Sequence, residues 1–216
     1  MLSVADQYLE AIFTLRREGE DAFTTTLADL FAVSRANAGA TLGRLTRDGL
    51  VQTDSRRILL TPEGRQRAEA GLRRHLLTEC FLLEVLGIGW ADVHEQARSF
   101  ERGLSPLLEG RIDERLEYPL ACPHGTPIPR ANQPAPDPAG TPLTQAPSDV
   151  PLVITQVSEL MEYRQESLRF CAGHRLIPST ALRILPGPAS PISVAMEHET
   201  VAIPSSLAAR IWVRPA

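Results

Sequence analysis

Apolar residues recur with helical spacing along the first half of the chain. Near the N-terminus they form one stripe, which predicts a helix: Val4, Tyr8, Leu9, Ile12, Phe13 and Leu15. Two shorter amphipathic segments follow, LADLFAV after Thr25-Thr26 and RANAGATLGRLTRDG after Ser34, each with a hydroxyl residue at the N-cap position. LVQTDSRRILLT then alternates around a polar tip and predicts a β-hairpin. Three helices and a hairpin in this order are typical of a winged helix-turn-helix.

Two long helices are predicted next. One opens at Thr61-Pro62 and ends at Gly87, and the other begins near Trp90 and runs to Tyr118. Ten of the 18 prolines then fall between Pro119 and Pro151, which predicts an extended linker. Beyond it, the short apolar runs PLVITQVSEL, LRIL, ISVAM, TVAI and IWV predict a small β-barrel with one helical insert, MEYRQESLRFCAGH.

Composition and charge limit the partners and the cellular location that we expect. The net charge is −4 and all 22 basic residues are arginine, so any DNA binding needs a local basic patch. No run approaches the ~18 apolar residues of a membrane span, and MLSVADQYLEAIF lacks the positive start of a secretory signal. The three cysteines are widely spaced and do not suggest a disulfide framework. We expect a cytoplasmic protein without membrane association.

The patch lies on the second helix of the predicted helix-turn-helix and on the hairpin tip. Residues 34–57 carry five arginines against two aspartates. Asn and Arg read base edges, whereas Ser, Thr and Arg hold phosphates. The predicted DNA contacts are Ser34, Arg35, Asn37, Thr41, Arg44, Arg47, Arg56 and Arg57. One such unit offers few contacts, so a homodimer on a palindromic operator is expected. The alternatives are a helical domain with solvated arginines and a protein-docking winged helix.

Several segments together carry a family resemblance: QYLEAIF, LTRDGLV, LTPEGRQRA, RRHLLTECFL, VHEQARSFERGLS and CPHGTPIP. From residue 4 to residue 130 the chain resembles the diphtheria toxin repressor and manganese transport regulator family of metal-dependent repressors. The tail resembles, more weakly, the SH3-like (FeoA-like) domain of three-domain members. The resemblance implies a dimer that binds Mn(II) or Fe(II), closes onto an operator and blocks transcription of metal-uptake genes.

The implied fold is mainly α with a small β part. Its expected divisions are a winged helix-turn-helix DNA-binding domain (1–62), a helical metal-binding and dimerisation domain (63–130), a proline-rich linker (131–151) and an SH3-like β-barrel (152–216).

The resemblance also implies a metal site. Its ligands fall on His75, Glu79, His94, Cys122 and His124. His75 and Glu79 are four residues apart and share a helix face, and the prolines around Cys122 pre-order a turn. Imidazole, carboxylate and thiolate donors suit a divalent transition metal rather than Mg or Ca. Mn(II) is expected first, with Fe(II) or another such ion as the alternative, and Glu166 or Gln165 as a further ligand.

That metal site matches the family's secondary site, whereas the family's primary site is degraded in this sequence. Its ligand positions fall on Gln7, Arg98, Glu101 and Arg102, with Glu10 nearby, and arginine has donors only. One hypothesis is that Arg98 or Arg102 replaces the ion by pairing with Glu101, Glu10 or Asp6. The other is that both arginines form ordinary surface ion pairs.

These features favour a metal-dependent transcriptional repressor of metal-homeostasis genes. The alternative is a DNA-binding regulator that is metal-independent or responds to oxidation of Cys122. An enzyme with Cys122 as nucleophile and His124 as base is disfavoured, because no third orienting group or oxyanion element is visible.

Overall fold

The computed structural model describes residues 4–130, 133, 135–161, 164–187 and 190–216. It begins with three helices and a hairpin: α1 (Val4–Arg17), α2 (Thr24–Leu30), α3 (Arg35–Arg47), β1 (Val51–Asp54) and β2 (Arg57–Leu60). The Ser34 side chain accepts a hydrogen bond from the Asn37 N–H at 3.2 Å and caps α3, and Gly49 follows the helix with φ +71°. The winged helix-turn-helix is therefore confirmed. Three details differ. The helix α2 ends at Leu30, its N-cap is Phe23 without a side-chain hydrogen bond rather than Thr25-Thr26, and Val4 of the predicted stripe is exposed.

Four helical segments follow: α4 (Pro62–Glu84), α5 (Val93–Phe100), the 3-10 turn η1 (Glu101–Gly103) and α6 (Pro106–Arg115). The single helix predicted up to Tyr118 is wrong, because the chain breaks between Gly103 and Pro106. The residue before a proline avoids the helical region, and Ser105 is extended and caps α6 through Leu108 N–H at 3.3 Å. Among the described residues, no helix is both long and apolar enough to cross a membrane.

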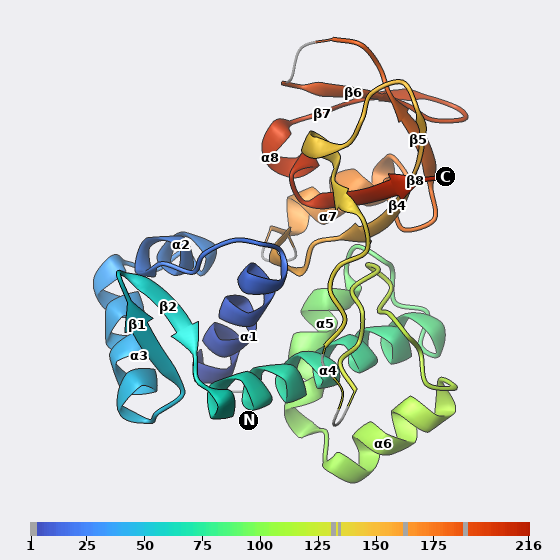
Figure 1. The fold of residues 1–216 in the computed structure, drawn as a ribbon. Coiled ribbons are helices and arrows are strands. Elements are labelled where there is room, and N and C mark those ends of the chain that lie inside the picture. Colours follow the sequence, from blue (N-terminus) through green and yellow to red (C-terminus); the bar gives the residue numbers. More distant parts are fainter. Residues whose placement is uncertain (1–3, 131–132, 134, 162–163, 188–189) are drawn as a thin grey trace.

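The C-terminal part is an antiparallel six-stranded sheet with the order β3-β8-β4-β5-β6-β7, consistent with an SH3-like fold (Figure 1). Its elements are β3 (Thr141–Pro142), η2 (Leu143–Gln145), β4 (Pro151–Val157), η3 (Glu159–Met161), α7 (Gln165–Gly173), β5 (Ala181–Ile184), β6 (Ile192–Ala195), β7 (Thr200–Ile203), α8 (Ser205–Ala208) and β8 (Ile211–Pro215). Residues 162–163 of the predicted insert lie outside the described residues.

Part of the predicted linker belongs to this sheet. Thr141 and Pro142 pair with Val213 and Trp212, and Leu143 is buried in the core of the sheet. Gly140 allows the close approach, because a Cβ there would lie 2.2 Å from the Val213 carbonyl oxygen. Residues 131–132 and 134 of the linker lie outside the described part of the chain.

The C-terminal sheet is docked against the helices. Leu160 of η3 is buried in the same apolar cluster as α1 and α4, whereas Trp90 packs against the core of the sheet. Ser158 donates a 2.6 Å hydrogen bond to Glu18 at the end of α1, and Arg210 pairs with the same carboxylate at 3.0 Å. These contacts hold η3 and the residue before it against α1 and its C-terminal end.

Candidate metal centre and nucleic-acid interface

A tight turn presents the thiol and the imidazole of CPHG. Cys122 N–H donates to the Thr126 carbonyl at 3.0 Å, and Gly125 N–H donates to the Cys122 carbonyl at 2.9 Å. Gly125 has φ +88°, and a Cβ there would lie 2.1 Å from the Thr155 carbonyl oxygen. Val157 N–H donates to the His124 carbonyl at 2.8 Å and ties the turn to β4. Both side chains are buried.

Two helices supply the other predicted donors. His75 and Glu79 lie one turn apart on α4, and His94 lies in the first turn of α5. All three side chains are buried. Burial of so many polar groups is costly unless they are paired or bind an ion.

Glu79 stands at the centre of these donors. Its Oε1 lies 3.1 Å from His75 Nε2 and 3.2 Å from His94 Nδ1. Its Oε2 lies 3.3 Å from His124 Nδ1. The two histidine nitrogens, His75 Nε2 and His94 Nδ1, are only 2.8 Å apart. Several lone-pair donors therefore converge within a small volume.

Glu159 of η3 is a donor that the sequence analysis missed. Its carboxylate groups with His75, Glu79 and His94, and the ligand atoms of this set lie within 4.8 Å of one another. A second set joins Glu79, Cys122 and His124. The Cys122 thiol lies 3.5 Å from Glu159 Oε1 and links the two sets. Little in the sequence indicated this ligand, because Glu159 lies 34 residues beyond Gly125 of the CPHG motif and follows a strand. Only the docking of the sheet brings its carboxylate to the centre.

The charge of the centre is set by its carboxylates. Burial and the nearby Arg98 oppose protonation of His75, but Glu79 and Glu101 outweigh them and raise the pKa of His75 well above its usual value. A cation at this place is thus electrostatically favoured. Two imidazoles, two carboxylates, a thiol and a third imidazole fit a divalent transition metal, because such ions accept mixed N, O and S donors.

Three further predicted ligands, Glu101, Glu10 and Glu166, lie outside the two donor sets. Glu101 accepts from His75 Nδ1 at 2.9 Å, and Glu10 pairs with Arg98 at 2.6 Å, so both border the centre without joining either set. Glu166 is exposed on α7 and belongs to neither donor set. The acid that this part of the chain brings to the donors is instead Glu159 of η3. Gln165 instead donates to Asp92 at 3.1 Å.

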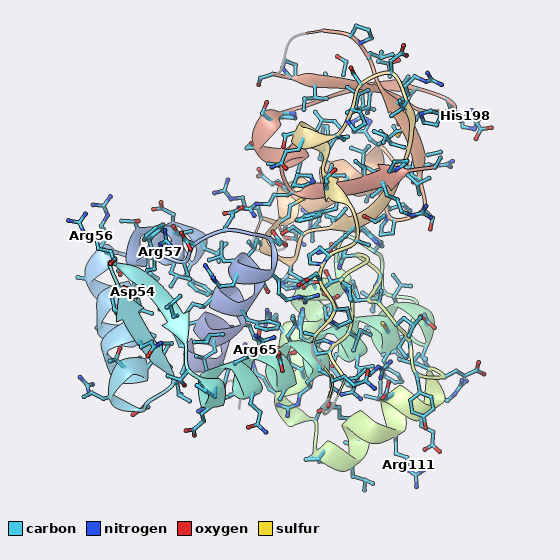
Figure 2. All side chains as sticks on the ribbon, viewed as in Figure 1. Asp54, Arg56, Arg57, Arg65, Arg111 and His198 are labelled. Carbon is cyan, nitrogen blue, oxygen red and sulfur yellow. The ribbon has the colours of Figure 1, made fainter. Side chains whose placement is uncertain are left out.

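The predicted DNA contacts lie at one end of the molecule. Figure 1 shows α3 and the β1–β2 hairpin on the side away from α6, and Figure 2 shows Arg56 projecting outward from the hairpin tip. The exposed members of the set are Ser34, Arg35, Asn37, Arg44, Arg47, Arg56 and Arg57. Thr41 is the exception: it is only 7% exposed, and its hydroxyl accepts from Arg44 at 3.5 Å. Arg57 also pairs with Asp21 at 3.0 Å.

Comparisons with known proteins define the class. Residues 1–59 match the iron-dependent repressor N-terminal DNA-binding domain, and residues 61–130 match the iron-dependent repressor metal-binding and dimerisation domain. The fold and site are thus those of a metal-dependent, DNA-binding transcriptional repressor rather than an enzyme. The chain belongs to the iron-dependent repressor family, which includes the diphtheria toxin repressor.

Individual relatives agree with this assignment. The iron-dependent repressor IdeR of Mycobacterium leprae is 28% identical over 99% of this chain and 97% of its own length. The diphtheria toxin repressor of Corynebacterium efficiens is 34% identical over 60% of this chain and 56% of its own length. These comparisons do not support the metal-independent alternative.

Two solved structures are similar over the whole chain. A manganese-dependent transcriptional repressor in complex with manganese is 33% identical, with a TM-score of 0.87 over 99% of this chain and 100% of that one. The manganese regulator SloR is 26% identical, with a TM-score of 0.87 over 100% of both chains.

Proposed function

We propose that this chain represses metal-homeostasis genes in the cytoplasm by binding a palindromic operator as a homodimer. The effector is a divalent transition metal, Mn(II) first, held by His75, Glu79, His94 and Glu159 together with Cys122 and His124. The observation that carries this proposal is the convergence of these buried donors from four segments of the chain. An ion there would join α4, α5, the CPHG turn and η3, and so fix the arrangement of the DNA-binding end. The predicted divisions at residues 62 and 130 are part of the same proposal, whereas the C-terminal domain would begin at β3 rather than at residue 152.

The choice of Mn(II) has chemical and comparative support. The two carboxylates provide oxygen donors, which manganese favours more than its later neighbours do. The proteins described as manganese-dependent align over nearly the whole chain. Fe(II) shares most of this donor preference and is the competing ion.

A homodimer is supported by exposed apolar side chains. Among the described residues, all but two of the large exposed apolar side chains lie between residues 85 and 120: Val85, Leu86, Phe100, Leu107, Leu108, Tyr118 and Leu120. Exposed apolar side chains that gather on a surface mark protein–protein contacts. Two copies present two reading helices, which matches a palindromic site.

The test is selection from a pool of randomised DNA duplexes by metal-free protein, with and without MnCl2. We expect a palindromic sequence to be enriched only in the presence of Mn(II). The triple variant E79A/C122S/H124A is expected to lose both Mn(II) uptake and enrichment. Equal enrichment without metal would contradict the proposal, as would a triple variant that behaves like the unaltered protein. Parallel selections with Fe(II) under anaerobic conditions and with Zn(II) rank the ions.

A further inference from the structure

Outside the metal centre, a deeply buried charged cluster joins α1 to α5 and η1. We propose that Arg98 is a built-in cation that ties Glu10 of α1 to Glu101, and that it passes occupancy of the metal centre to the DNA-binding end. The inference concerns the regulation of the proposed metal site and therefore rests on the proposed function.

One guanidinium holds two carboxylates here. Arg98 Nη1 lies 2.6 Å from Glu10 Oε2 and 3.5 Å from Glu101 Oε1. The side chains of Arg98, Glu10 and Glu101 are 14%, 3% and 1% exposed. Buried carboxylates are expensive unless a cation compensates them, and breaking such a pair leaves an uncompensated charge. Arg98 thus compensates part of the cost of burying these two acids, and it opposes the rise that burial gives the pKa of Glu10.

The position of Glu10 depends on this pair. Gly71 of α4 leaves room for it, because a Cβ at Gly71 would lie 2.4 Å from Glu10 Oε1. That oxygen is buried and has no hydrogen-bond partner among the described residues. The other oxygen is held by Arg98. The guanidinium is therefore the group that fixes this carboxylate of α1.

The cluster is continuous with the metal centre. Glu101 Oε2 lies 2.9 Å from His75 Nδ1, and His75 Nε2 lies 3.1 Å from Glu79 Oε1. An ion on Nε2 would leave Nδ1 as the nitrogen that carries the proton, and this N–H would donate to Glu101. The path from the centre to α1 then runs through His75, Glu101, Arg98 and Glu10. Each contact is largely shielded from water, so salt screens it little.

Because the cation in this link is an arginine side chain, the link does not depend on metal concentration. The guanidinium stays charged at any working pH and cannot dissociate from the chain. It also has donors only, so a divalent ion cannot share its place between the two acids. Arg102, the other candidate from the sequence, donates to the Arg98 backbone carbonyl at 3.2 Å instead. The occupancy of the metal centre then varies with metal concentration, whereas the connection to α1 through Arg98 is permanent.

The first test separates coupling from folding. Arg98→Met removes the charge but keeps the length of the chain, and Arg98→Lys keeps the charge. Arg111→Met is the matched control, because Arg111 is 70% exposed and pairs only within α6, with Glu114 at 2.7 Å. Mn(II) affinity is measured by calorimetry, and affinity for the selected duplex is measured with and without Mn(II). Arg98→Met is expected to bind Mn(II) within about threefold of the unaltered protein but to lose most of the metal-induced gain in DNA affinity, which for coupled sites is on the order of 5- to 150-fold.

A second readout does not require DNA. Arg98→Ala leaves Glu10 and Glu101 without a cation, so we expect one more Mn(II) bound per protomer than in the unaltered protein, and the double variant R98A/E10Q is expected to lose it. An unchanged metal-induced gain in Arg98→Met, or no additional ion in Arg98→Ala, overturns the inference. Absence of any Mn(II) response in the unaltered protein contradicts the proposed function and overturns the coupling with it.

Discussion

Glu159 illustrates how much a single residue can depend on tertiary structure. Its carboxylate reaches His75, Glu79 and His94 because η3 docks between the helices and the sheet. The helix spacing of His75 and Glu79 and the CPHG motif were readable in the sequence. Glu159 was not, since nothing in its neighbourhood repeats or matches a ligand pattern. From the sequence, a ligand in this part of the chain was expected at Glu166, seven positions later.

Glu159→Gln tests this assignment. Loss of one carboxylate donor is expected to weaken Mn(II) binding by at least about 10-fold, the lower bound even for groups that only support ligands. Glu166→Gln is the control, because Glu166 is exposed. Calorimetric titration with MnCl2 measures both variants. Similar affinities for the two variants would contradict the assignment.

Two of the three thiols are protected by their surroundings. Burial raises the pKa of Cys80 and of Cys171 to about 12. At pH 8 only about one such thiol in ten thousand is ionised, and the thiolate is the reactive form. We expect iodoacetamide to leave Cys80 and Cys171 unmodified in the native protein and to modify all three cysteines after denaturation, as read by mass spectrometry. Native labelling at either residue at the denatured rate would contradict this.

At the scale of elements, local signals predicted more than long-range ones. Ser34, Asp48-Gly49 and Thr61-Pro62 placed the ends of α3 and the start of α4 correctly, because caps act within a few residues. The two-residue strand β3 was missed, since its partner β8 lies some 70 positions further along and propensity carries no such information. The break before Pro106 was readable and was overridden by an apolar pattern that continued across it.

Variants of α3 and of the hairpin tip can separate phosphate contacts, which position the protein on DNA, from base recognition. Arg56→Ala removes a charge at the hairpin tip and is expected to weaken all sequences alike and to reduce the salt dependence by about one phosphate contact. Asn37→Ala is expected to cost about 1–3 kcal/mol at one base position only. Fluorescence anisotropy with single-base variants of the selected duplex, at several salt concentrations, measures both. A sequence-dependent effect of Arg56→Ala would contradict the division of roles.

For the whole molecule, the docking of the sheet matters for metal binding. Ser158 and Arg210 hold Glu18, the residue that follows α1, and the next residue after Ser158 is the candidate ligand Glu159. Arg210→Ala is expected to weaken Mn(II) binding roughly threefold to tenfold, equivalent to the ~1 kcal/mol of a partly exposed ion pair. Arg183→Ala is the control, because its pair with Asp149 lies within the C-terminal part. Equal effects of the two variants would contradict the link.

The exposed apolar region gives a prediction about assembly. Leu120 is 83% exposed and Leu107 is 71% exposed. The double variant L107E/L120E is expected to shift the protein from dimer to monomer in sedimentation velocity, because charged groups are excluded from interface cores. Val4→Glu, at an exposed apolar position on α1, should leave the dimer intact. A dimer that survives L107E/L120E would place the contact elsewhere.

The positions of the two Glu79 oxygens have a consequence for how the protein would respond to a change in metal concentration. Oε1 faces His75 and His94, whereas Oε2 faces His124. Because one carboxylate faces donors from α4, α5 and the CPHG turn, an ion bound there would be held from all three sides at once. Its loss would release these three segments together, so the protein would respond to falling metal in a single step.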